Sequence, residues 1–219
     1  MGWLLNSLNS SIGKKFVMAI TGVCLLSFLI VHLIGNMTLY ISKETFTGYV
    51  HILEAIKPLI RVIEIILALI FLLHIYNGVR LWYQNKKAKP IGYTVNAADK
   101  NSTLFSRTMF ISGSIIFIFL VLHLQTIWYK FNFSGEELSL YDIVVEWFRV
   151  PWYSVLYVIA TFLMGMHLNH GFQSAFQTFG WNHNKYTPLI KALGTIYSII
   201  MAAAFASIPI YFLFFNGGN

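Results

Sequence analysis

Charge is scarce in this 219-residue chain, in which Asp, Glu, Lys and Arg together make up 11% of the residues. In a soluble globular domain these residues make up about 25%. Hydrophobic residues make up 57% of the chain, and the mean hydropathy is +0.66. The scarcity of charge therefore excludes an ordinary soluble domain and indicates a membrane protein.

Cysteine is also nearly absent, because Cys24 is the single one and lies within an apolar stretch. This excludes a disulfide framework, a Cys-x-x-Cys site for zinc or an iron–sulfur cluster, and the Cys-x-x-Cys-His motif of covalent haem attachment. The sequence also lacks a dinucleotide fingerprint and a context for flavin attachment. Any cofactor must therefore be held without covalent thioether links.

Long hydrophobic runs, in contrast, are plentiful. Each is long enough to cross a hydrocarbon core of about 30 Å at about 1.5 Å per residue. The runs cover roughly residues 15–40, 59–83, 105–129, 152–179 and 189–215. They predict an all-α membrane protein in which residues 1–219 form a single bundle of five transmembrane helices. A cleaved signal peptide is not expected, because the first run has full span length and no small-x-small site follows it.

The uneven distribution of basic residues predicts the orientation. If residue 1 is cytoplasmic, ten of the fifteen Lys and Arg residues lie on that side with one acid, Asp99, while the opposite side carries seven acids. The positive-inside rule then places the N-terminus in the cytoplasm. The basic face suits anionic lipid or a soluble partner. Nucleic acid is not indicated, since the charge lies in short loops.

Four of the five runs contain a histidine near mid-depth: His32, His74, His123 and His167. A polar group in hydrocarbon costs free energy, so such a residue indicates a functional site. Counted along the helices, the first and third lie in the outer half of the membrane, and the second and fourth lie in the inner half. Two pairs on separate helices are what two stacked haem irons with imidazole ligands require. Such irons have no open coordination position, which suits electron transfer.

Local sequence supports this pairing. The histidines of the first and third runs lie in the similar segments FLIVHL and FLVLHL. Those of the second and fourth runs are each followed four residues later by a glycine, Gly78 and Gly171, which could make room for a macrocycle. This spacing favours His167 over His170 as a ligand. Gly22 and Gly113, ten residues before their helix's histidine, would let the inner haem approach closely, although small-residue helix packing is an alternative.

Other readings of the histidines stay open. A histidine inside the membrane is often an interhelical hydrogen-bonding residue or part of a proton relay. A small transporter or channel using these histidines with Glu64 is therefore an alternative function. A metal site built from His167 and His170 lacks a third ligand on that helix.

A resemblance to a known family is carried by three segments: SSIGKKFVMAITG with FLIVHLIGN, RVIEIILALIFLLHIYNGVRLW, and HLNHGFQSAFQTFGW. They resemble the cytochrome b membrane-anchor subunit of succinate:quinone oxidoreductases, in the single-subunit, five-helix, two-haem type of succinate dehydrogenases and fumarate reductases. The similarity covers nearly the whole chain. It implies that His32 and His123 ligate the haem distal to the soluble subunits, and that His74 and His167 ligate the proximal haem.

The resemblance also implies partners and a function. A flavoprotein and an iron–sulfur protein would dock on the cytoplasmic face, in a bacterial inner membrane. Electrons would pass from the iron–sulfur protein through two haem b groups to a quinone, expected to be menaquinone, or in reverse for fumarate reduction. This chain would not oxidise succinate itself, since it lacks the flavin and cysteine motifs. A cytochrome b subunit of another respiratory dehydrogenase or hydrogenase is a close alternative.

The segment YVHILEAIKPLIRVIE is unusually rich in titratable groups for a membrane boundary: His51, Glu54, Lys57, Arg61 and Glu64. A quinone needs an apolar slot, hydrogen-bonding groups and an acid or base. We expect Glu54 with His51 to provide these groups, with Arg61 and Glu64 as the next candidates. Pro58 fits a first helical turn, which would place Glu54 on the connection that leads into the helix. The alternative is an interfacial loop with solvated charges.

Two basic residues are candidates for pairing with haem propionates. Arg80 lies six residues, about 9 Å, on the cytoplasmic side of His74, close to the inner haem. Lys57 flanks the depth of the outer haem. The alternative for both is that the side chain reaches out to lipid headgroups.

Overall fold

The computed structural model describes residues 2–88, 102–135 and 138–215, and every regular element in these ranges is helical. The elements are α1 (Gly2–Asn9), α2 (Ser11–Met37), the 3-10 turn η1 (Thr38–Tyr40), α3 (Lys43–Ala55), α4 (Lys57–Lys87), α6 (Leu104–Arg107), α7 (Met109–His123), the π-helical turn η2 (Leu124–Tyr129), α8 (Lys130–Phe133), α9 (Leu140–Phe148), α10 (Pro151–Thr178) and α11 (Thr187–Phe214). Five residues of the charge count lie outside the described residues: Lys89, Asp99, Lys100, Glu136 and Glu137.

In the described ranges, five helical stretches are long and apolar enough to cross a membrane: Ser11–Tyr40, Lys57–Lys87, Met109–Phe133, Pro151–Thr178 and Thr187–Phe214. They confirm the five predicted runs. Their boundaries follow from local chemistry. The Ser10 hydroxyl accepts a hydrogen bond from the Gly13 N–H at the start of α2, which satisfies a donor that the first turn leaves free. Helices α4, α10 and α11 each have proline in the first turn, where its missing N–H costs nothing.

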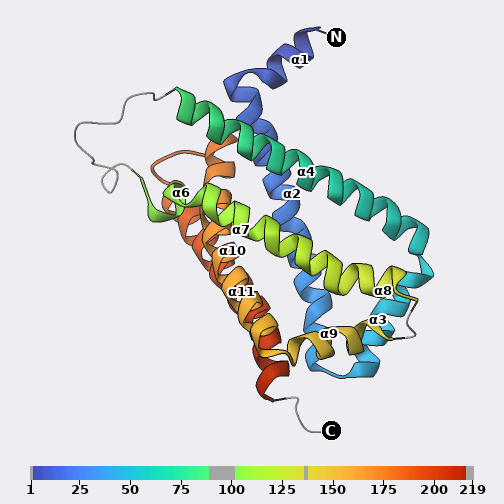
Figure 1. The fold of residues 1–219 in the computed structure, drawn as a ribbon. Helices are drawn as coiled ribbons and strands as arrows, with labels where there is room; N and C mark the ends of the chain where they lie inside the picture. Colours follow the sequence, from blue (N-terminus) through green and yellow to red (C-terminus); the bar gives the residue numbers. More distant parts are fainter. Residues whose placement is uncertain (1, 89–101, 136–137, 216–219) are drawn as a thin grey trace.

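Four of the long helices form a ring. Helix α2 packs against α4 and α10, and α7 packs against the same two helices. Helices α2 and α7 are therefore diagonally opposite, as are α4 and α10. Helix α11 packs along α10 on the outside of the ring (Figure 1). This contact is close, since a Cβ added to Gly165 would lie 2.8 Å from Cβ of Ala202.

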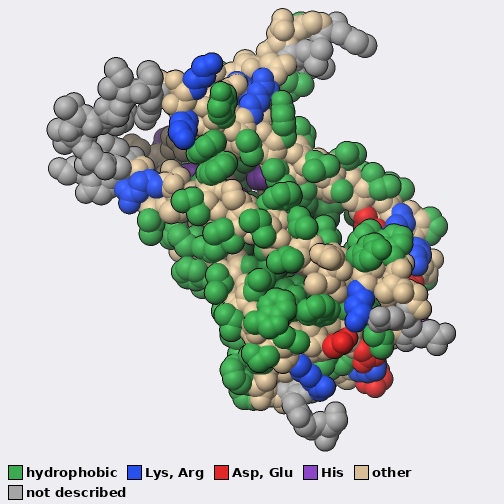
Figure 2. All heavy atoms as spheres, viewed as in Figure 1, with side chains coloured by type: hydrophobic (Ala, Val, Ile, Leu, Met, Phe, Trp, Pro, Cys, Tyr) green, Lys and Arg blue, Asp and Glu red, His purple; other side chains and the backbone are tan. Residues whose placement is uncertain are grey.

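The short helices α3, α8 and α9 gather at one end of the ring, where α4 begins (Figure 1). A buried hydrophobic core at this end includes Leu39, Phe46, Ile143 and Phe148. All described acids belong to this end: Glu44, Glu54, Glu64, Asp142 and Glu146. We call it the acid-bearing end and the opposite one the basic end. Figure 2 shows the red side chains on the right and at the lower right of the view, and only blue charged side chains at the top.

The expectation that Glu54 lies on a connection is wrong. Glu54 belongs to the last turn of α3, and the chain changes direction at Ile56 alone. The segment folds as a helix because it has its own N-cap and an apolar face. The Ser42 hydroxyl accepts from the Thr45 N–H, and Phe46 and Val50 are buried.

The third span also departs from a regular α-helix. Directly after His123 the chain forms the π-helical turn η2. Such turns are rare and frequently occur at functional sites. Thr126 and Trp128 lie in this turn, and both make polar contacts with neighbouring helices.

Candidate functional site

The structure brings the four mid-depth histidines together in two pairs. The ring centroids of His32 and His123 lie 5.9 Å apart, and those of His74 and His167 lie 6.5 Å apart. Each pair joins diagonally opposite helices, α2 with α7 and α4 with α10. This is the pairing that depth along the helices predicts. Ligation of a metal stays a prediction.

The separation of each pair fits two imidazoles that share one iron. Metal–imidazole bonds are about 2 Å long, so two imidazoles on opposite sides of one ion have ring centres roughly 6 Å apart. All four histidines are only half-buried although they lie at mid-span, and Figure 2 shows histidine side chains (purple) between the apolar ones. Among the described residues, no group of three or more His, Cys, Asp or Glu side chains could hold a metal ion. Each pair supplies two imidazole donors, a set that suits a macrocycle-bound iron with two protein ligands.

Hydroxyl groups contact both histidines of the inner pair. Oγ1 of Thr21 lies 3.0 Å from Nδ1 of His74, and Oγ of Ser112 lies 3.3 Å from Nδ1 of His167. Both hydroxyl residues are buried. A ring nitrogen engaged in this way leaves the other one, Nε2, for a metal.

A glycine follows each of these hydroxyl residues and admits the facing ring. A Cβ added to Gly22 would lie 3.6 Å from Cε1 of His74, and a Cβ added to Gly113 would lie 3.3 Å from Cε1 of His167. The sequence singled out these glycines as close-approach positions, and the structure places both of them against the inner pair.

A chain of hydroxyls ends at the outer pair. The hydroxyl of Tyr157 lies 2.9 Å from Nδ1 of His123 and 2.7 Å from the hydroxyl of Tyr153. The Tyr153 hydroxyl lies 2.6 Å from Oγ1 of Thr126, which donates to the Leu122 carbonyl. On the other side of the pair, the ring of His32 stacks on an aromatic neighbour of its own helix, Phe28, at 5.3 Å.

A cavity of about 290 Å³ opens at the acid-bearing end and brings His51 and Glu54 together. Its lining residues are Thr47, Val50, His51, Glu54, Phe131, Leu138, Ser139, Leu140 and Tyr141. The Thr47 hydroxyl is buried and has no hydrogen-bond partner among the described residues. A buried polar group without a partner is costly, so it favours a ligand with a hydrogen-bonding atom at this position.

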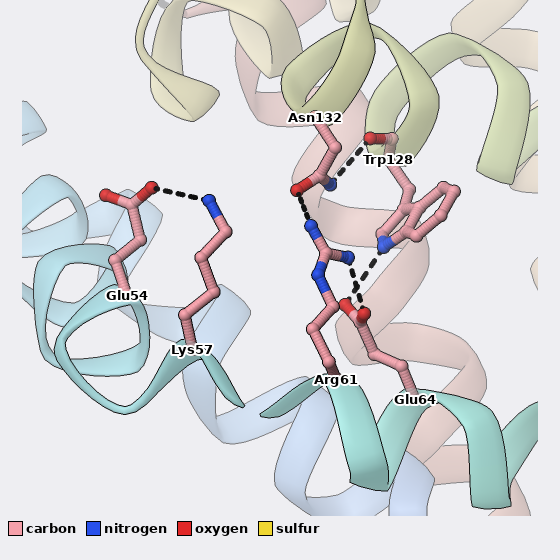
Figure 3. Close-up of polar contacts among 6 residues, drawn as sticks. All are labelled: Glu54, Lys57, Arg61, Glu64, Trp128 and Asn132. Carbon is pink, nitrogen blue, oxygen red and sulfur yellow. Dashed lines mark hydrogen bonds and ion pairs between the residues drawn. The ribbon is translucent and has the colours of Figure 1, made fainter. Parts of the chain in front are cut away.

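The other two predicted quinone residues lie elsewhere. Figure 3 shows Arg61 and Glu64 with two residues of the third span, apart from Glu54. One oxygen of Glu64 lies 2.6 Å from Nη1 of Arg61, and the other accepts from Nε1 of Trp128 at 2.9 Å. Arg61 also donates to Oδ1 of Asn132. Both oxygens of Glu64 are thus engaged, one within α4 and one with Trp128 of η2, while Arg61 ties α4 to α8. Neither Arg61 nor Glu64 lines the cavity.

An ion pair joins two walls of the cavity. Nζ of Lys43, on α3, donates to both carboxylate oxygens of Asp142, on α9, at 2.6 and 2.8 Å. The Ser139 hydroxyl donates to the same carboxylate at 2.7 Å. Burial alone would raise the pKa of Asp142, but the hydrogen bonds and charge of Lys43, with the hydrogen bond of Ser139, lower this pKa below its ordinary value.

The model of one protein family, the succinate dehydrogenase/fumarate reductase transmembrane subunit, matches residues 16–93 and 85–208. These ranges cover most of the chain and include all four paired histidines. The chain belongs to this family. It is therefore the membrane anchor subunit of a succinate dehydrogenase or fumarate reductase, and thus a subunit of a succinate:quinone oxidoreductase complex. Among curated proteins and solved structures, none matches the chain.

The family often binds haem b and anchors the catalytic subunits of its complex. In this anchor subunit, the two predicted propionate partners have other contacts. Nη1 of Arg80 donates to Oδ1 of Asn9 at 2.9 Å, and Nζ of Lys57 lies 3.9 Å from Oε1 of Glu54. Sequence reasoning did not single out Lys14 as a site residue. Lys14 is buried near the basic end, and its Nζ donates a hydrogen bond to Oε1 of Gln84 at 2.6 Å.

Proposed function

We propose that this anchor subunit is a single cytochrome b domain of the five-helix, two-haem type. It passes electrons between the iron–sulfur subunit and a membrane quinone, for which menaquinone is the expected species. The observation that supports this most is the pair of short ring distances, 5.9 and 6.5 Å, between histidines of diagonally opposite helices. Haem b, when bound, carries single electrons, and two imidazole ligands leave no position for oxygen.

The histidines would hold the two irons through Nε2. His74 and His167 would serve the haem near the basic end, and His32 and His123 would serve the haem near the acid-bearing end. The protein around each pair sets the chemistry through hydrogen bonds to the imidazoles and through exclusion of water. The ring of helices α2, α4, α7 and α10 supplies this environment.

The cavity at the acid-bearing end is the proposed quinone site. A quinone takes up two protons when it accepts two electrons, so the site needs groups that can hold and transfer protons. The Glu54 carboxylate and the His51 imidazole do this, and the Thr47 hydroxyl, which has no partner in the described part of the chain, donates to a quinone oxygen. Apolar lining from Val50, Phe131 and other residues suits the ring of the quinone.

The basic end is proposed to face the bacterial cytoplasm and to carry the flavoprotein and iron–sulfur subunits. The described basic residues of this end agree with the positive-inside rule: Lys14, Lys15, Arg80, Lys86, Lys87, Arg107, Lys185 and Lys191. Electrons then cross the membrane toward the acid-bearing end. Turnover should therefore depend on membrane potential, by up to ~2.3 kcal/mol per charge and 100 mV for a full crossing.

The test is haem content after single replacements. In the purified complex, a reduced-minus-oxidised spectrum should show two b-type haems. His32→Ala or His123→Ala should remove one haem, and His74→Ala or His167→Ala should remove the other. A colourless wild-type complex would instead favour a proton-relay transporter. Loss of a haem in His170→Ala, with both retained in His167→Ala, would show that the wrong histidine was assigned.

A further inference from the structure

A two-residue unit occurs twice in the ring of helices. Thr21–Gly22 on α2 and Ser112–Gly113 on α7 each consist of a hydroxyl residue followed by glycine. In each unit, the hydroxyl contacts Nδ1 of the inner histidine on an adjacent helix, and the glycine lies against Cε1 of the same ring. The same contacts thus form on both sides of the inner pair, from helices that are diagonally opposite.

The hydroxyl protons determine which way these hydrogen bonds run. Oγ1 of Thr21 donates to the Val17 carbonyl at 2.8 Å, one turn earlier on its own helix. Oγ of Ser112 donates to the Met109 carbonyl at 3.2 Å. Because a hydroxyl has a single proton, an oxygen that donates to its own helix can only accept from the facing imidazole. Nδ1 of each inner histidine then carries the proton, and Nε2 keeps its lone pair.

The glycines set the position of the rings. At Gly113 an added Cβ would lie 3.3 Å from the ring of His167, which is tighter than ordinary contact, so the ring lies where only glycine leaves full room. At Gly22 the corresponding distance to His74 is 3.6 Å. Each unit therefore fixes its histidine twice, through the hydrogen bond at Nδ1 and through the surface against which the ring lies.

We infer that Thr21 and Ser112 are positioning residues for the inner histidine pair: they hold both imidazoles as the Nδ1–H tautomer, with the two Nε2 atoms available to one iron. This inference rests on the proposed function, in which that pair ligates haem. A hydrogen bond from Nδ1–H makes imidazole a more basic ligand. A more basic ligand favours ferric iron, so both hydroxyls lower the midpoint potential of the inner haem.

The test compares two matched pairs of variants in the purified complex. Thr21→Val and Ser112→Ala each remove one hydroxyl from the inner pair. Ser27→Ala and Ser114→Ala remove hydroxyls from the same two helices. In the described part of the chain these hydroxyls donate only along their own helix, to the carbonyls of Val23 and Phe110. The measurement is the midpoint potential of each haem by redox titration. It should rise for the inner haem in Thr21→Val and in Ser112→Ala, and stay at the wild-type value in both controls.

Thr21→Ser retains the hydroxyl and should keep the wild-type potential, which separates the hydrogen bond from side-chain volume. An unchanged inner potential in both Thr21→Val and Ser112→Ala, or an equal rise in the controls, would overturn the inference. The inner haem is identified as the one lost in His74→Ala. If that variant keeps both haems, the proposed ligation fails instead, so the two failures are distinguishable.

Discussion

The hydroxyl oxygen of Tyr157 lies 2.9 Å from Nδ1 of His123. It is the last member of a chain in which Thr126 donates to the Leu122 carbonyl, so Tyr153 donates to Thr126 and Tyr157 donates to Tyr153. The Tyr157 oxygen is then left to accept from His123. Tyr157 is 6% exposed and Tyr153 is 1% exposed, so water does not compete for these hydrogen bonds. His123 is thus held by a phenol, whereas His74 and His167 are held by aliphatic hydroxyls.

Tyr157→Phe should raise the midpoint potential of the outer haem and leave the potential of the inner haem unchanged. The phenyl ring keeps the packing but removes the acceptor for Nδ1–H, which makes the imidazole a weaker donor to iron. Redox titration of the purified complex measures this shift. The control is Tyr197→Phe, which removes a hydroxyl that donates to the Leu26 carbonyl at 2.8 Å. Equal shifts in the two variants would contradict a specific role for Tyr157.

Gly113→Ala should disturb the inner haem more than Gly22→Ala does. The added methyl group would lie 3.3 Å from the His167 ring in the first case and 3.6 Å from the His74 ring in the second. The tighter contact forces the ring to move, and such overpacking costs about 1–3 kcal/mol. Haem content and the thermal midpoint of the purified complex report the effect. A larger effect of Gly22→Ala would mean that the bound macrocycle, not the facing ring, limits space at these positions.

Much of this organisation could be predicted from the sequence. The five spans follow from the length of the apolar runs, and the pairing of the histidines follows from their distance to the helix ends, because helices rise by a constant amount per residue. The glycines near the inner pair could also be found. Thr21 and Ser112 stand directly before them, but hydroxyls in membrane helices commonly bond to their own helix. Only the repetition of hydroxyl and glycine in both helices would have given a signal.

Other features depend on contacts between distant segments. The hydroxyl chain that leads to Tyr157 begins at Thr126, in the π-helical turn after His123, and no local sequence pattern predicts this turn. The separation of Glu64 from Glu54 results from the change of direction at Ile56, which places α3 and α4 on different surfaces. In the sequence both acids belong to one titratable segment. Glu64 could be assigned to its contact with Trp128 only after the helices were packed.

The ion pair between Lys43 and Asp142 predicts a pH dependence. The pKa of Asp142 is lower in the folded chain than the value of about 3.9 in an unfolded one. Its stabilising contribution is therefore present above about pH 4 and is lost as the pH falls through the folded-state pKa. The side chains are 50% and 37% exposed, so the contribution should be about 0.2–1 kcal/mol.

Asp142→Asn should accordingly lower the thermal midpoint of the detergent-solubilised complex at pH 7, and the difference from wild type should vanish under acid conditions. In a Lys43→Met background the same replacement should have a smaller effect, since the partner charge is already gone. A pH-independent difference would assign the effect to packing or to the Ser139 hydrogen bond.

Glu54→Gln should separate quinone chemistry from the rest of the electron path. The variant keeps the shape of the cavity lining but cannot exchange a proton at this position, and a positioned acid–base group typically contributes about 100-fold or more to rate. Both haems and succinate-to-dye activity should stay normal, while quinone-linked activity should fall by about that factor.

Glu64→Gln is the matched control, because it makes the same chemical change ten residues further along the chain, outside the cavity. It should weaken the contacts with Arg61 and Trp128, and so lower thermal stability, yet keep most quinone activity. The opposite result, with quinone activity lost in Glu64→Gln and retained in Glu54→Gln, would move the quinone site from the cavity to the surface around Arg61.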